Sequence, residues 1–88
     1  MTTRKILIKE EPQQLTTGKE TAVIQFNGSL ALCDSEEKPA AGAAAMYFPS
    51  DCRYQTITIT PLFRAWIWST VPGETVDVVI SDWTETVN

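Results

Sequence analysis

The 88-residue sequence contains no histidine, which is the usual general base and the commonest metal ligand among side chains. Serine and cysteine nucleophiles that depend on a neighbouring imidazole are therefore excluded. A Ser-x-x-Lys spacing occurs at Ser35 and Lys38, but it lies in a segment with proline and glycine rather than at a helix start. The adjacent glutamates at 10–11 and 36–37 point apart in an extended chain, so neither pair surrounds one substrate. We expect a protein that is not an enzyme.

Metal-binding and phosphate-binding patterns are also missing. The two cysteines, Cys33 and Cys52, lack the CxxC spacing of zinc and redox sites, and no histidine completes a metal set. The sequence has no glycine-rich phosphate loop and no aspartate-rich calcium loop. We therefore expect no metal and no cofactor. The cysteines either close a disulfide or remain thiols, and a reducing cytoplasm favours two small, half-buried thiols.

Long apolar runs and concentrated positive charge are absent too. The apolar part of "MTTRKILIKEEPQQ" is only residues 6–8, which is too short for a signal peptide or a membrane span, so we expect synthesis in the cytoplasm and no membrane partner. Seven Lys and Arg residues against eleven Asp and Glu residues give a net charge of −4. Because the basic residues are scattered, we expect no nucleic-acid binding. An acidic surface suits solubility or docking on a basic protein face.

What the chain does contain is alternation of apolar and polar residues with a period of two. Short alternating or β-branched segments predict strands at residues 4–9, 21–26, 29–34, 43–48, 54–60, 64–69 and 75–83. Proline and glycine separate these segments, as expected between strands. The pattern predicts an all-β fold, a small antiparallel β-sandwich or barrel of about seven short strands.

The chain is short enough for one core, with residues 20–88 as the β-sandwich domain. Residues 1–19 are predicted as an N-terminal strand and a possible arm that adds a strand to a neighbouring subunit. At Asn27-Gly28, either the flanking strands pair as a hairpin or the second strand begins after a tight bend. Residues 35–42 are predicted as an exposed loop.

The stretch "RAWIWS" (64–69) carries two tryptophans on one face of a predicted strand, with Ala65 and Ile67 on the opposite face. The tryptophan face is either core or an interface. If Ala65 and Ile67 join the valine-rich face of the last strand in the core, the tryptophans lie outside, where exposed apolar patches mark interaction sites. Trp83 is the expected third member of such a patch. The candidate interface comprises Trp66, Trp68, Trp83, Arg64, Ile6 and Ile8.

The order of segments resembles the small virion-associated β-sandwich proteins of tailed bacteriophages. The resemblance rests on "AVIQFNGSLALC", the acidic loop "DSEEKPAAG", "MYFPSDCRYQTITIT" and "RAWIWSTVPGETVDVVIS", and it covers residues 20–82. Its marks are Gln-x-Asn-Gly at 25–28, the turn at 49–51, the WxWS strand at 66–69 and the valine-rich strand at 76–80. The turn "FPSDC" lacks the glycine of that pattern.

The resemblance implies a structural role in the virion, as a capsid decoration (cement) protein or a small head or tail component. It also implies a homo-oligomer, with a trimer favoured, bound to the major capsid protein or another virion protein. The alternatives are a carbohydrate- or receptor-binding module that uses Trp66 and Trp68 as a stacking platform, and an accessory protein that binds one bacterial protein.

Overall fold

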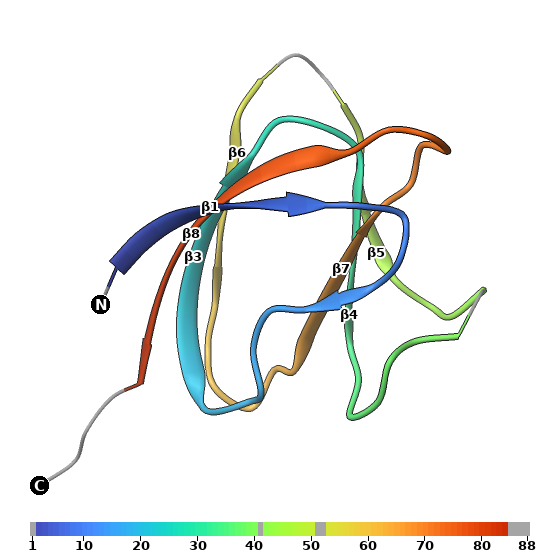
Figure 1. Ribbon diagram of the computed structural model, residues 1–88. Coiled ribbons are helices and arrows are strands. Elements are labelled where there is room, and N and C mark those ends of the chain that lie inside the picture. Colours follow the sequence, from blue (N-terminus) through green and yellow to red (C-terminus); the bar gives the residue numbers. More distant parts are fainter. Residues whose placement is uncertain (1, 41, 51–52, 85–88) are drawn as a thin grey trace, which may run out of the picture.

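The computed structural model describes residues 2–40, 42–50 and 53–84, which form eight strands and no helix (Figure 1). The strands are β1 (Thr2–Ile8), β2 (Gln13–Gln14), β3 (Glu20–Phe26), β4 (Leu30–Asp34), β5 (Met46–Phe48), β6 (Gln55–Ile59), β7 (Ala65–Ser69) and β8 (Val76–Thr84). They make two four-stranded sheets, sheet A in the order β1-β8-β3-β6 and sheet B in the order β2-β7-β4-β5. All pairs are antiparallel. The prediction of a small all-β sandwich is confirmed.

The inward side chains of the two sheets form one core, because alternation along each strand sends every second residue inward. Its buried apolar members include Ile8, Ala22, Ile24, Phe26, Leu30, Leu32, Ile59, Ala65, Ile67, Val76, Val78 and Ile80. Phe26 of sheet A meets Phe48 of sheet B edge to face, with ring centroids 5.5 Å apart. Full burial of each large side chain contributes about 1.5–3 kcal/mol, so this layer is the main source of stability.

The Asn27-Gly28 bend carries the chain from sheet A to sheet B. β3 pairs with β8 and β6, whereas β4 pairs with β7 and β5, so the two strands do not form a hairpin. Of the two predicted alternatives, the tight bend is confirmed. Gly28 has a φ of +157°, and a Cβ there would lie 2.9 Å from Cγ2 of Val76. The bend therefore requires glycine for both its backbone conformation and its close approach to β8.

The N-terminal segment belongs to both sheets. β1 pairs with β8 from Thr2 to Ile8, and Ile8 is fully buried in the core. The short strand β2 then pairs with β7 at the edge of sheet B. The segment predicted as an N-terminal strand and possible arm is thus part of the sandwich of its own chain (Figure 1).

Most strands lie within two residues of their predicted bounds, and the largest differences concern β5 and β2. The segment predicted at 43–48 is a strand only from Met46 to Phe48, because the alanines before it have low β propensity. β2 was not predicted, since two glutamines carry no apolar alternation and form a strand only because β7 offers an edge. Cys33 lies in β4 and is buried, and desolvation raises the pKa of its thiol. Cys52 lies outside the described residues. The prediction of two thiols rather than a disulfide therefore stays a prediction.

Candidate binding surface

β7 places its tryptophans on the outer face of sheet B. Ala65 and Ile67 are buried in the core, whereas Trp66 and Trp68 alternate with them and are half-buried. The predicted separation of the two pairs onto opposite faces is confirmed, and of the two alternatives for the tryptophans the core is excluded. The outer face of sheet B therefore carries two large aromatic side chains that the core does not use.

The strand register brings Tyr47 onto the same face as Trp68. Ala31 of β4 is opposite Trp68 on one side and opposite Tyr47 on the other. Strands are about 4.8 Å apart, so the two aromatic residues stand about 10 Å apart across a small alanine. Tyr47 is 65% exposed. These two rings, on either side of the fully buried Ala31, make an aromatic surface on sheet B.

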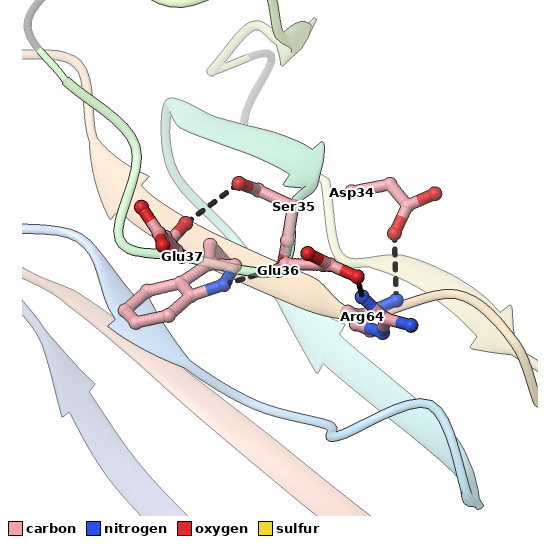
Figure 2. Close-up of polar contacts among 6 residues, drawn as sticks. Asp34, Ser35, Glu36, Glu37 and Arg64 are labelled. Carbon is pink, nitrogen blue, oxygen red and sulfur yellow. Dashed lines mark hydrogen bonds and ion pairs between the residues drawn. The ribbon is translucent and has the colours of Figure 1, made fainter.

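Trp66 and Arg64 hold the segment that follows β4 (Figure 2). The indole Nε1–H of Trp66 donates to the carbonyl of Ser35 at 3.0 Å. The guanidinium of Arg64 forms an ion pair with Glu36 at 2.7 Å, and its backbone N–H donates to the carboxylate of Asp34 at 2.8 Å. These contacts fasten the start of the predicted loop, at Ser35 and Glu36, to β7 and to the residue that precedes it. Trp66 and Arg64 therefore position a loop, whereas the indole of Trp68 makes no hydrogen bond to another described residue.

Two open hollows meet at Trp68. Both are lined by Trp68, Tyr47 and Glu10, and their volumes are about 430 Å³ and 270 Å³. The larger also contacts Glu11 and Lys38, and the smaller runs toward Thr70. We call the two hollows together the Trp68 groove. It joins side chains from β5, from β7 and from the β1–β2 connection.

The groove is acidic. Glu10 accepts a hydrogen bond from the backbone N–H of Gly73, which fixes its carboxylate beside the aromatic rings. Glu11 forms an ion pair with Lys38, and the hydrogen bond from Lys38 lowers the pKa of Glu11. Among the described residues that line the groove, Lys38 is the only cation. Because Lys38 is paired with Glu11, the carboxylate of Glu10 gives the groove its net charge.

The other predicted interface residues lie elsewhere. Trp83 pairs with Thr21 on the outer face of sheet A, so it is on the opposite side of the sandwich from Trp66 and Trp68. Ile8 is in the core, and Ile6 packs against the core. The structure thus brings Arg64, Trp66 and Trp68 together on sheet B and does not bring the remaining three to them.

Sequence reasoning missed Tyr47 and Glu10. Tyr47 fell within a predicted strand, but its face depends on the register with β4. Glu10 was considered only as one of two adjacent glutamates. The signal that could have found Tyr47 is the same alternation that separates Trp66 from Ile67, applied to "MYF". No local pattern places Glu10 beside Trp68.

A separate apolar slot opens between the sheets where β5 and β6 form their edges. It has a volume of about 230 Å³ and is lined mainly by Leu32, Met46, Phe48, Ile57, Ile59 and Phe63. Within residues 2–40, 42–50 and 53–84, no three His, Cys, Asp or Glu side chains are grouped to hold a metal ion. The same described residues contain no helix long and apolar enough to cross a membrane.

Comparison with family models, curated proteins and solved structures finds no match.

Proposed function

We propose that this chain is a non-enzymatic structural protein of a bacteriophage virion, a decoration protein that stabilises the head by binding capsid subunits. The observation that carries the proposal is the placement of Trp68 and Tyr47 on the outer face of sheet B, outside the core. Aromatic side chains dominate the energetics of protein interfaces, and an aromatic surface left open on a small domain marks a contact site. The resemblance of residues 20–82 to virion-associated sandwiches supplies the kind of assembly.

The chemistry of the Trp68 groove supports binding rather than catalysis. Among the described residues that line it, the charged groups are two carboxylates and Lys38, and Lys38 is half-exposed and held in an ion pair with Glu11 rather than desolvated as a catalytic lysine. The hydroxyl of Ser69, at one end, is engaged with the backbone of Val71. An open surface with two aromatic rings suits contact with another macromolecule better than enclosure of a small substrate.

We further propose that the protein forms a homo-oligomer on the virion, with a trimer as the state that the resemblance implies. The edge strands of a sheet present unpaired backbone groups that can pair with another chain. β1 and β6 are the edges of sheet A, and β2 and β5 are the edges of sheet B. The partner is then the major capsid protein or another virion protein.

The direct test is the location of the protein in the phage whose genome encodes it. We expect mass spectrometry to find the chain in purified virions, and the purified protein to sediment with heads from a strain in which its gene is deleted. Heads of an unrelated phage serve as the control. Absence from virions together with failure to sediment with the deleted heads contradicts the proposal.

A carbohydrate-binding module is the second candidate, and the pairing of Trp68 with Tyr47 beside Glu10 favours it. The platform would be these two rings rather than Trp66 and Trp68, because the indole of Trp66 is bonded to Ser35. This candidate predicts a change in tryptophan fluorescence on titration with host-surface oligosaccharide. Loss of that change in Trp68→Ala, but not in Trp83→Ala, would support it over head binding.

A further inference from the structure

The Trp68 groove combines the two features that attract a cationic side chain. A guanidinium or ammonium group is drawn to the face of an aromatic ring, most strongly to tryptophan, when it lies within about 6 Å of the ring centre. It is also drawn to a carboxylate, which arginine contacts through two parallel hydrogen bonds. Trp68, Tyr47 and Glu10 offer these features together.

The arrangement of the three side chains favours one shared site. All three line both hollows, so a side chain that enters from either end meets the same rings and the same carboxylate. The Gly73 N–H bonds Oε1 of Glu10, and this contact positions the carboxylate before any ligand arrives. Ala31, which lies between the two aromatic residues in the sheet, is fully buried, so a flat group such as guanidinium would meet the rings in the two hollows that they line rather than over the alanine.

The negative charge of the groove favours a cation over a neutral sugar as its ligand. The Glu11–Lys38 ion pair is internally neutral, whereas no cation among the described residues is paired with Glu10. The whole chain carries a net charge of −4, which also attracts a basic partner. A neutral sugar can donate a hydroxyl hydrogen bond to Glu10, but it gains no attraction between opposite charges from Glu10 or from the net charge.

We propose that the Trp68 groove binds an arginine or lysine side chain presented by a partner protein. The inference rests on the proposed function only in taking the partner to be a protein. On a phage head, the groove would receive a basic side chain from an exposed segment of a capsid subunit.

The experiment is a titration of the full chain followed by NMR spectra of backbone and indole N–H groups. The probe is a blocked five-residue peptide that alternates glycine and arginine, and the matched control peptide has glutamate in place of arginine. We expect shifts concentrated at the Trp68 indole and at Tyr47, with the hydrogen-bonded Trp66 indole less affected. Raising the salt concentration should weaken binding, because the attraction includes a charge on a solvated surface.

Two variants measure separately what the Glu10 charge and the Tyr47 ring contribute to binding of the arginine peptide. Glu10→Gln keeps an oxygen that can accept from Gly73 but removes the charge, and Tyr47→Ala removes one ring. Each should raise the dissociation constant of the arginine peptide by at least about fivefold, as expected for loss of one favourable cation contact. Their controls are Asp77→Asn, an exposed acid on sheet A, and Tyr54→Ala, an exposed tyrosine outside the groove, and neither should change the constant.

Several outcomes would overturn the inference. The first two are equal NMR shifts with the glutamate peptide and no shifts at millimolar arginine peptide. The others are an unchanged dissociation constant in Glu10→Gln and NMR shifts of the same groups with maltohexaose in place of the peptide. Head binding tests the proposed function separately. If heads bind wild type and Glu10→Gln equally, the groove inference fails while the decoration role stands, and if only the peptide binds, the decoration role fails.

Discussion

At the scale of single residues, Thr16 is the clearest case of a polar group built into the core. Its side chain is 1% exposed, its hydroxyl donates to the carbonyl of Phe63 at 2.8 Å, and its oxygen accepts from the N–H of Ala65 at 3.0 Å. The hydroxyl thus joins the segment after β2 to the start of β7. Because β7 carries the tryptophans, this buried contact helps to position the binding surface.

Thr16→Val should destabilise the fold by about 1–3 kcal/mol. The change keeps the shape of the side chain but leaves the carbonyl of Phe63 and the N–H of Ala65 without that partner. Urea denaturation followed by circular dichroism measures the effect. Thr16→Ser keeps the hydroxyl and is the control, and a loss of stability as large as that of the valine variant would show that the hydrogen bonds are not responsible.

The ion pair between Arg4 and Asp82 predicts a dependence of stability on pH. Both nitrogens of the guanidinium fork bond the carboxylate, at 2.8 Å and 3.2 Å, and this contact lowers the pKa of Asp82. A lowered pKa in the folded state means that the contribution is complete above the unfolded pKa, about 3.9. It is lost as the pH falls through the folded pKa.

Asp82→Asn should therefore be less stable than wild type near pH 7 and should converge with it in acid. Because the pair is partly exposed, the difference at neutral pH should be no more than about 1 kcal/mol. Thermal unfolding between pH 2 and pH 7 measures it. Arg4→Gln should reproduce the effect without adding to it in the double variant, and additive losses would show that the two residues act independently.

At the scale of elements, the bend between β3 and β4 decides that the chain forms a sandwich rather than one meander. Gly28 gives this bend a φ of +157° and lies against Val76 of β8. Gly73 has a φ of +78°, but a Cβ there would contact nothing within 4 Å. The two glycines therefore both have a positive φ, at different values, and they differ in packing.

Gly28→Ala should cost about 2–4 kcal/mol, the sum of backbone strain and overpacking against a core valine. Gly73→Ala should cost only about 1 kcal/mol, because it adds strain without a clash. Chemical denaturation of both variants compares the two terms directly. Equal losses would mean that the contact with Val76 contributes nothing.

The same elements show how far the sequence determines the fold and the site. Alternation in "RAWIWS" separates Ala65 and Ile67 from the tryptophans, because a strand has a period of two whatever it packs against. It does not decide which face is buried, since that depends on the sheet opposite. Tyr47 and Glu10 reach Trp68 only through the β4–β5 register and the β1–β2 connection, and these are long-range pairings that no local pattern encodes.

At the scale of the whole molecule, the two outer faces differ. Sheet B presents the Trp68 groove with its acidic rim, and sheet A presents Trp83 on the opposite side. An account in which the tryptophans together form one patch is incompatible with this arrangement. Our proposal accordingly places docking on sheet B and contacts between copies of the chain at the edges of the two sheets.

The central claim is that Trp68 serves a partner and is not needed for the fold. The most direct measurement is sedimentation of Trp68→Ala with phage heads, beside Tyr54→Ala as a control, on proteins whose folding is verified by circular dichroism. We predict that Trp68→Ala stays folded and binds heads at least about tenfold more weakly, as expected for loss of a central aromatic contact, while the control binds as wild type does. A Trp68→Ala protein that binds heads with wild-type affinity, or that does not fold, would contradict the account.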